Sequence, residues 1–206
     1  MNKKINISII GTRGYPYVYS GYETFVKQLS ERLVLKDCNV TVYCHKGLFE
    51  IRPKEIKGIK LVYIPTIETK ILSQPIHSFL SIIHACFSNT DVLLVVNSAN
   101  GPFGLLTKLF KVPTAINVDG LEWLRPKWKG LGSIYFKWAS KMATLFYDQI
   151  INDSDEMRKV YLNLFKRDSK VIAYGADIRK SKNPDLINKW NLKQREYYLV
   201  IGRLIP

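Results

Sequence analysis

The sequence predicts an α/β fold in which a parallel β-sheet carries helices on both faces. Short apolar runs rich in β-branched residues alternate along the chain with segments of helical periodicity. The central runs, at residues 92–96 and 113–118, have no polar alternation, which is typical of strands buried on both faces. Strands separated by helices of roughly 10–15 residues favour parallel connections. Folds of this kind bind ligands outside the carboxyl ends of their strands, so candidate chemistry is sought there.

The predicted strands are the runs whose β-branched residues favour extended backbone. The first, at 5–10, ends at a glycine-containing loop at 11–20. The later strands are expected at 39–45, 59–64, 92–96, 113–118, 149–151 and 170–173.

The predicted helices are segments whose apolar residues recur three and four positions apart and so share one face. The first follows the glycine loop and carries such a face at Tyr22, Phe25, Val26, Leu29 and Leu33. Further helices are expected at 75–88, 102–110 and 154–165. A last stripe consists of Ile134, Tyr135, Trp138, Met142, Leu145 and Phe146.

The composition changes after the last of these strands. We expect residues 1–178 to form the amino-terminal domain and the polar, Lys- and Asn-rich residues 179–195 to form a linker. Residues 196–206 are predicted to begin a second domain, because 197–201 is a β-prone run followed by Gly202 and Arg203. An isolated strand cannot form a domain, so the sequence predicts a chain cut short.

Composition narrows the class of partner. The 206 residues include 47% apolar side chains, enough for a packed core, and 31 Lys+Arg against 17 Asp+Glu give a net charge of +14. This charge favours anionic partners, but no nucleic-acid-binding module is recognisable, so no nucleic acid is expected. The three cysteines and three histidines show no metal-ligand spacing, and no targeting segment is visible. A cytoplasmic protein with reduced thiols, soluble or peripheral to a membrane, is therefore expected.

The loop after the first predicted strand contains the pattern Gly-Thr-Arg-Gly-Tyr-Pro and leads into Ser20-Gly-Tyr-Glu23. Glycines let a backbone approach a ligand closely, and a helix amino terminus favours an anion. The pattern is neither a dinucleotide fingerprint nor a Walker loop, which argues against nicotinamide and ATP. Ser20 and Glu23 also fit a capping box, and for Glu23 both roles stay open.

A second constellation, at 117–125, follows a buried strand. It brings two carboxylates, Asp119 and Glu122, close in sequence to Trp123 and Arg125. Sugar-binding sites use carboxylates to hold hydroxyl groups and aromatic rings to stack on pyranose rings. The alternative is a polar loop with an Asp-Gly turn and a surface pair between Glu122 and Arg125.

Three weaker signals follow other strands: Asn97 to Gly101, Asp153-Ser154 and Tyr174 to Asp177. Each is more often structural, and Asp153-Ser154 most simply supplies a helix cap.

Basic and aromatic residues are interleaved around residues 123–141. The basic residues are Arg125, Lys127, Lys129, Lys137 and Lys141, and the aromatic ones are Trp123, Trp128, Tyr135 and Trp138. This pattern favours an interfacial helix on an anionic membrane surface. The alternative is an ordinary amphipathic helix whose apolar stripe belongs to the core.

Taken in order, these motifs resemble the GT-B glycosyltransferases of family 4, most closely the bacterial rhamnosyltransferase-like branch of capsule and cell-wall polysaccharide assembly. The resemblance covers essentially the whole chain and implies two Rossmann-like domains facing across a cleft. The amino-terminal domain would take the acceptor and the other domain the nucleotide sugar. The implied reaction transfers a sugar, with rhamnose from dTDP-rhamnose as the candidate, to a lipid-linked saccharide at the inner face of the cell membrane. No metal or other cofactor is expected.

The resemblance also implies residue roles. Asp119 would be the catalytic-centre residue. The donor diphosphate would be contacted by Gly11, Gly14, Gly21 and Arg203, and the acceptor by Arg13, Glu23, Glu122, Trp123 and Arg125. Two positions depart from the family pattern: Ser20 replaces a glycine, and Asp119 stands where many relatives carry histidine. The rival interpretation is a stand-alone, non-catalytic module that binds a glycan or lipid, or one subunit of a split enzyme; the sequence that follows Pro206 would discriminate.

Overall fold

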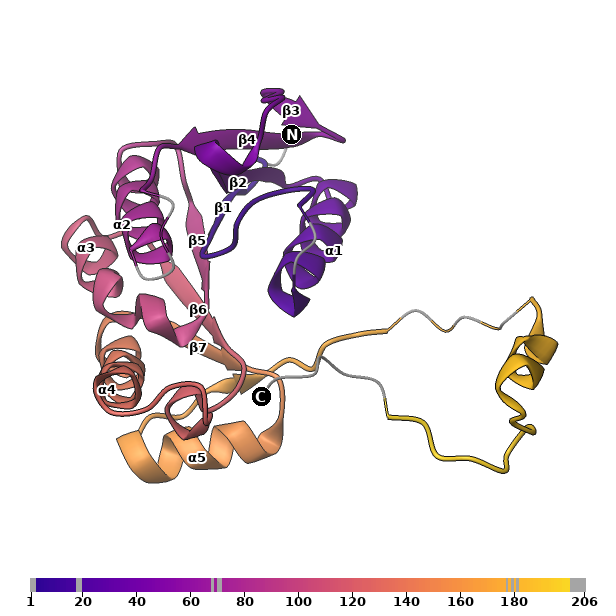
Figure 1. The fold of residues 1–206 in the computed structure, drawn as a ribbon. Helices are drawn as coiled ribbons and strands as arrows, with labels where there is room; N and C mark the ends of the chain where they lie inside the picture. The colour runs from indigo at the N-terminus through magenta and orange to yellow at the C-terminus, as the bar shows by residue number, and fades with distance from the viewer. Residues whose placement is uncertain are drawn as a thin grey trace. The chain divides into compact units, whose positions relative to one another are not determined.

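The chain consists of two compact units, 1–174 and 175–206, in a computed structural model that describes residues 3–17, 20–67, 69, 72–176, 178, 180 and 182–200. The larger unit is an eight-stranded sheet with helices around it (Figure 1). Its strands are β1 (Asn6–Ile10), β2 (Asn39–His45), β3 (Glu55–Ile56), β4 (Ile59–Ile64), β5 (Val92–Val96), β6 (Thr114–Val118), β7 (Gln149–Asn152) and β8 (Lys170–Val171). Its α-helices are α1 (Gly21–Leu35), α2 (Ser73–Cys86), α3 (Gly104–Leu109), α4 (Leu131–Phe146) and α5 (Asp155–Phe165). Short 3-10 helices are η1 (Lys46–Leu48), η2 (Ser98–Phe103) and η3 (Glu122–Leu124).

The strand order is β3-β4-β2-β1-β5-β6-β7-β8. All neighbouring strands pair in parallel except β3 and β4, which are antiparallel. The predicted α/β sheet is therefore confirmed, with one short antiparallel edge added. The chain builds outward from β1 through β2 to β4 and then crosses to β5 on the other side of β1. The carboxyl ends of β1 and β5 thus flank the position where strand order reverses, the usual place for a ligand crevice.

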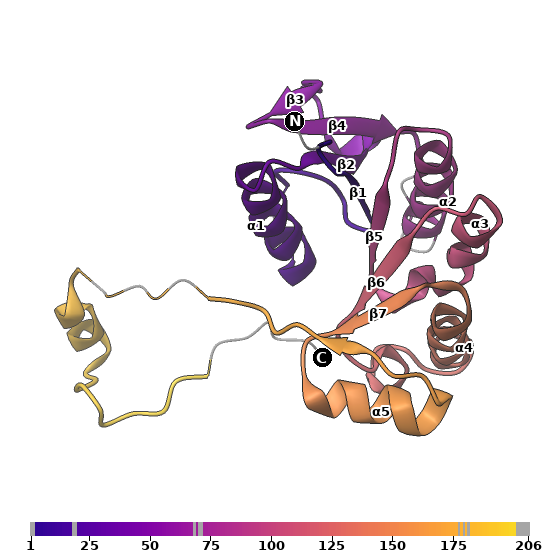
Figure 2. The same ribbon diagram turned by 180° about the vertical axis from the view of Figure 1, so that it is seen from behind.

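Alternate residues of the central strands enter two separate cores, one on each face of the sheet. On one face Ile10 of β1 packs in a cluster with Ile82 of α2, Ala143 of α4 and Tyr161 of α5. On the other face Ile9 belongs to a cluster whose helical residues all come from α1. Figure 2 shows α1 on the side of the sheet opposite to α2, α3 and α4. The predicted helices on both faces are present, but they are unevenly divided.

Helix α4 forms where it was predicted but buries a different face. Ile134 and Trp138, expected to share an apolar stripe, are exposed, whereas Ala139 and Ala143 are buried. A Cβ built on Gly101 would lie 1.9 Å from the carbonyl oxygen of Ala139, so η2 and α4 meet backbone against backbone. Such close packing requires small residues at the contact, so Ile134 and Trp138 lie outside it, whereas Phe136 of the same helix is buried.

The smaller unit contains one 3-10 helix, η4 (Pro184–Trp190), among its described residues. The strand expected at 197–201 is absent from its described part, residues 197–200. A strand satisfies its backbone groups by pairing with a neighbouring strand, and the described residues of this unit provide no such neighbour. Gly202 and Arg203 lie outside the described residues.

Candidate functional site

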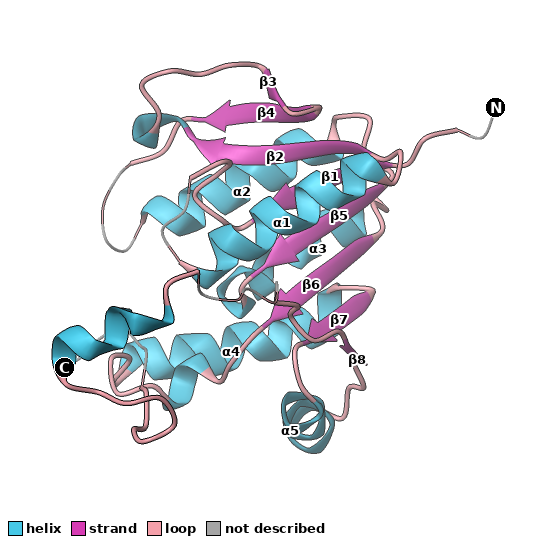
Figure 3. Ribbon diagram, turned by 90° about the vertical axis from the view of Figure 1, so that its right-hand side faces the viewer, coloured by secondary structure: helices cyan, strands magenta, loops and turns pink. Residues whose placement is uncertain are grey.

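The loops that contain the predicted motifs all begin at the same edge of the sheet. The loop 11–20 follows β1, the turn at Asn97 follows β5, Asp119 follows β6 and Asp153 follows β7. Because these strands are parallel, their carboxyl ends meet at one edge (Figure 3). The edge therefore brings together loops that are far apart in the sequence.

Asp119 lies at the centre of a hydrogen-bonded cluster that joins three segments of the larger unit. The Tyr22 hydroxyl, on the first turn of α1, donates to Oδ1 of Asp119. The Tyr174 hydroxyl donates to Asn117 Oδ1 at 2.8 Å and lies 3.4 Å from Asp119 Oδ2. The Tyr174 ring packs on Phe25 of α1, with centroids 5.0 Å apart. Two phenols thus fix the orientation of the Asp119 carboxylate.

Burial and neighbouring charges shift the pKa values of the side chains in this cluster. Burial raises the pKa of Asp119 above its ordinary value, and the hydrogen bond from Tyr22 opposes that rise. The carboxylates of Asp153 and Glu122 raise the Asp119 pKa further. Burial, reinforced by the Asp119 charge, also raises the pKa values of Tyr22 and Tyr174, so both phenols remain protonated donors. Asp119 is therefore a better proton acceptor than an exposed aspartate.

The residues after Asp119 form a compact, self-supporting loop. Arg125 Nη2 pairs with Glu122 Oε1 at 3.0 Å, and Trp128 Nε1 donates to Glu122 Oε2 at 3.0 Å. The surface pair considered from the sequence is therefore present. Trp123 is only 8% exposed and packs edge-on against Phe165. Its burial favours a core role over stacking on a sugar ring, whereas Arg125 remains half exposed.

The predicted glycines have different environments. Gly11 has a φ of +107°, and a Cβ there would lie 2.3 Å from the carbonyl oxygen of Val96. Gly14 has a φ of +128°, and its Cβ would lie 2.7 Å from Cys44 Sγ. Internal packing therefore explains these two glycines. Gly21 has open space around it at the start of α1, which leaves room for a ligand.

Glu23 holds the first loop onto α1. Its carboxylate accepts a hydrogen bond from the Arg13 backbone N–H at 3.2 Å and another from the Ser20 hydroxyl. Ser20 makes no side-chain hydrogen bond to the helix backbone, so the reciprocal capping box is not formed. Both Glu23 oxygens are engaged and the side chain is buried, which favours an organising role in the loop. The acceptor contacts of Glu23 and Arg13 stay predictions.

The weaker motifs are structural in two cases. Asn97 accepts a hydrogen bond from the Ala99 backbone N–H at 2.9 Å, and Asn100 Nδ2 donates to the Val96 carbonyl at 2.7 Å. The Ser154 hydroxyl accepts from the Met157 backbone N–H and caps α5, as predicted.

Sequence reasoning missed the residues that position Asp119. Tyr22 was placed on the apolar face of its helix and within the motif that ends at Glu23, Asn117 was the first residue of the 117–125 constellation, and Tyr174 belonged to a weaker motif. None of the three was predicted to contact Asp119. A hydroxyl-bearing residue in the first turn after the glycine loop was the available signal for Tyr22. Asp177 and Arg203, both in motifs of the resemblance, lie outside the described residues.

Across the described ranges, no group of three or more His, Cys, Asp or Glu side chains is placed to hold a metal ion. In the same part of the chain, no helix combines the length and apolar character that crossing a bilayer requires.

Comparison with known proteins gives one family and a set of shared folds. The family model described as Domain of unknown function (DUF1972) matches residues 4–177. No curated protein matches the sequence. Sucrose-phosphate synthase from Thermosynechococcus elongatus superimposes with a TM-score of 0.70 at 15% identity, covering 92% of this chain and 53% of that one.

Two plant structures have weaker similarity. UGT2 of Phytolacca americana, solved with UDP-2fluoro-glucose and pterostilbene, has a TM-score of 0.53 at 10% identity and covers 94% of this chain and 58% of that one. UGT89C1 of Arabidopsis thaliana, solved with UDP-L-rhamnose, has a TM-score of 0.50 at 13% identity and covers 92% and 55%. The chain thus spans about half the length of these structures and has the fold of the Rossmann-like half of a GT-B glycosyltransferase.

Proposed function

We propose that this chain, which belongs to the DUF1972 family, is the amino-terminal, acceptor-binding half of a glycosyltransferase with a nucleotide-sugar donor. The observation that carries the proposal is the Asp119 carboxylate, half-buried and held by two phenols at the carboxyl edge of the sheet. The fold shared with halves of GT-B glycosyltransferases supports it. The ordered motifs that resemble family 4 support the same class.

The chemistry of sugar transfer suits such a carboxylate. The attacking acceptor hydroxyl must lose a proton, and the transition state has oxocarbenium character with positive charge on the sugar. A preorganised carboxylate can accept the proton and stabilise that charge. The raised pKa of Asp119 makes its carboxylate a stronger proton acceptor than that of an exposed aspartate. In the proposed mechanism Tyr22 and Tyr174 keep the carboxylate aimed, and Asp119 orients the acceptor hydroxyl.

The finer assignments are proposals that rest on the motif resemblance. The donor would be dTDP-rhamnose and the acceptor a lipid-diphosphate-linked saccharide of surface polysaccharide assembly. Glu122 and Arg125, paired beside Asp119, would contact acceptor hydroxyls. Gly21, with open space at the start of α1, would face the donor diphosphate, and Arg203 would contact the same group. The enzyme would work in the cytoplasm, peripheral to the inner face of the cell membrane.

The test uses the protein expressed from the complete reading frame that contains these residues. Purified enzyme is assayed with nucleotide sugars and lipid-linked acceptors, and single-turnover rates are compared with thermal melts. Asp119→Asn keeps the shape of the side chain but removes its charge, so turnover should fall by about 10²–10⁴, the range for acid–base groups. Glu122→Gln is the matched control and should change acceptor binding more than turnover.

Retention of more than about half of the wild-type rate by Asp119→Asn would contradict the catalytic assignment, because an acid–base loss is far larger. Saturable glycan or lipid binding without turnover with any donor would instead favour the non-catalytic module.

A further inference from the structure

The helices of the larger unit differ sharply in their content of acidic residues. Helices α2, α3 and α4 contain no Asp or Glu at all. By contrast, α1 contains Glu23 and Glu31, and α5 begins with Asp155 and Glu156. The absence of acidic residues is thus a property of α2, α3 and α4, which lie on one face of the sheet in Figures 1 and 2. Helix α5 packs in the same core but is acidic in its first turn.

The same three helices expose large apolar side chains. On α4 Ile134 is 66% exposed and Trp138 is 48% exposed, and on α3 Leu109 is 68% exposed. The other exposed apolar residues of these helices and their carboxyl-terminal caps are Phe79, Leu80, Phe87, Leu105, Phe110, Leu131, Tyr135 and Leu145. Around them the exposed cations are Lys108, Lys111, Lys137 and Lys141. We call this surface the α2–α4 face.

Contacts between the helices make this face continuous. Phe87, after α2, packs edge-on against Phe110, after α3, with ring centroids 5.0 Å apart. Lys108 Nζ, on α3, donates to the Leu145 carbonyl near the end of α4 at 3.1 Å. A side-chain contact also joins α2 to η2 through Phe79. The three helices therefore present one surface to a partner.

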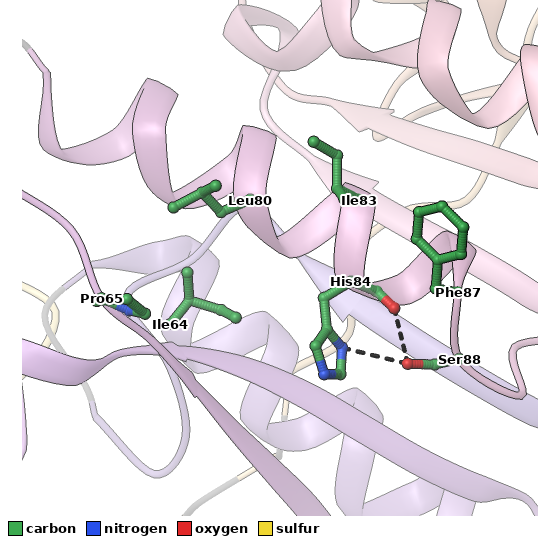
Figure 4. Close-up of a pocket in the computed structure, with 7 residues that line it drawn as sticks. All are labelled: Ile64, Pro65, Leu80, Ile83, His84, Phe87 and Ser88. Atoms are coloured by element: carbon green, nitrogen blue, oxygen red, sulfur yellow. Dashed lines mark hydrogen bonds between the residues drawn. The ribbon is translucent and has the colours of Figure 1, made fainter.

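The face is indented beside α2. A hollow of about 430 Å³ runs between the end of β4 and α2 (Figure 4). Its lining is mostly apolar and includes Leu80 and Phe87, which also belong to the α2–α4 face. The apolar surface thus continues from the exposed side of α2 into this hollow.

We propose that the α2–α4 face is a membrane-docking surface that inserts its apolar residues into the interface of an anionic bilayer. This deepens the proposed function and rests on it for the peripheral location, but it replaces a single basic helix with a three-helix layer. Exposed apolar side chains on helices that also expose lysines match the two components of interfacial binding, apolar burial and attraction to anionic lipid. The lack of carboxylates removes the repulsion that an anionic surface would otherwise meet.

Charge distinguishes this occupant from a second copy of the chain. Two copies packed through this face would place lysines against lysines, with no acidic side chain on the three helices to pair with them. Like charges brought together at an interface are unfavourable. An anionic bilayer has the complementary charge and an apolar interior.

The first experiment measures partition of the purified chain onto vesicles by sedimentation. Phosphatidylcholine vesicles that contain phosphatidylglycerol should retain the protein, and pure phosphatidylcholine should retain much less. A Trp190→Phe background removes an exposed tryptophan of the smaller unit and leaves Trp123, Trp128 and Trp138. Their emission should shift to the blue and be quenched by brominated lipid, and an added Trp138→Phe should remove that shift. Neither nucleotide sugar nor acceptor is present, so the result is independent of whether the protein transfers sugar.

Matched variants then locate the surface. Leu109→Gln on α3 and Ile134→Gln on α4 should each weaken partition about ten-fold, the effect of losing one buried aliphatic side chain. Leu35→Gln, at the exposed end of α1, is the control and should bind like the wild type. Lys137→Gln with Lys141→Gln should weaken binding about five-fold per lysine, and Lys36→Gln should not.

Several outcomes would overturn the proposal. Equal binding to neutral vesicles would show that anionic lipid does not contribute to binding. A loss of vesicle binding with Ile134→Gln but not with Leu109→Gln would restrict the contact to α4. A concentration-dependent dimer that Ile134→Gln dissociates would assign the face to a second copy. Absence of vesicle binding by a folded chain would reject the surface altogether, whatever the transfer assay shows.

Discussion

Replacing Tyr22 by phenylalanine tests whether the Asp119 cluster is held as the structure indicates. The substitution keeps the ring, which packs in the α1 core, and removes only the hydroxyl that donates to Asp119. The half-buried carboxylate then loses one of the two phenol donors that hold it. We therefore expect a stability loss that is specific to the hydrogen bond.

The size of the loss follows from the charge and burial of the partners. A hydrogen bond to an ionised group contributes about 1.5–3 kcal/mol, so Tyr22→Phe should lower the free energy of unfolding by that amount at neutral pH. Tyr174→Phe should cost only about 0.5–1.5 kcal/mol, because its shorter bond goes to the neutral amide of Asn117. Tyr135→Phe is a control of the same smaller size, since the Tyr135 hydroxyl donates to a backbone carbonyl.

Urea denaturation with a double-mutant cycle measures the pair directly. Tyr22→Phe removes the donor, and Asp119→Asn removes the negative charge that strengthens the same hydrogen bond, so their combined effect should depart from additivity by more than about 0.5 kcal/mol. Additive losses, or a Tyr22→Phe loss no larger than that of Tyr135→Phe, would refute the hydrogen-bonded clamp.

The pH dependence of stability provides an independent test of the interaction between Tyr22 and Asp119. The folded-state pKa of Asp119 is raised above its ordinary value of 3.8, so the folded state holds this proton more tightly than the unfolded chain. The Asp119 contribution to stability is therefore greatest below pH 3.8 and is lost as pH rises through the folded pKa. Tyr22 lowers the Asp119 pKa, so Tyr22→Phe should extend this loss to higher pH. An unchanged pH profile would argue that the two side chains do not interact.

Two further predictions concern the frame around the site. The rings of His45 and His77 stack with centroids 3.8 Å apart, and burial lowers the pKa of His77 to about 3, so the free energy of unfolding should fall by up to about 1.4 kcal/mol per pH unit as pH drops from 6.5 towards 3. Urea titrations should show this slope, and His77→Gln should reduce it to the part that carboxylates with lowered pKa values, such as Asp168, contribute. Gly101→Ala would place a Cβ 1.9 Å from the Ala139 carbonyl oxygen and should cost about 1–3 kcal/mol or more, whereas Gly21→Ala, in open space, should cost less than about 1 kcal/mol. Equal thermal melts for the two alanine variants would contradict the backbone contact between η2 and α4.

The parts of the fold that the sequence predicted are those with a long enough local pattern. Strands β2, β4 and β5 lie at their predicted residues because apolar β-branched runs reveal buried strands. Strand β3 has two residues, too few for any periodicity, and it exists because β4 offers an edge for antiparallel pairing. The buried face of α4 was predicted wrongly because the largest apolar side chains were assumed to lie on the face that packs in the core. The close backbone contact with Gly101 requires a residue as small as Ala139 on the buried face, and Ile134 is exposed.

The candidate site was predicted only in outline for a similar reason. That Asp119 lies at a strand's carboxyl end follows from local pattern and topology, and both can be inferred from the sequence. The Tyr22 and Tyr174 contacts join residues 97 and 55 positions away from Asp119, and no local pattern records such distances. Which phenol reaches the carboxylate depends on how α1 and the segment after β8 pack against β6, which is a tertiary property.

The distribution of charge links the site to the proposed half of the enzyme. A protein with a net charge of +14 places Asp119, Glu122 and Asp153 close enough for their carboxylates to raise one pKa at the carboxyl edge. Such a cluster repels a diphosphate but suits sugar hydroxyl groups, which donate hydrogen bonds to carboxylates. Under the proposed function this edge would therefore fit an acceptor better than a nucleotide sugar, and the donor phosphates would need cations outside the cluster. Arg203, in the motif beyond the described residues, is the candidate that the resemblance offers for that task. A donor that bound equally well after Arg203→Gln would show that the phosphates are neutralised elsewhere.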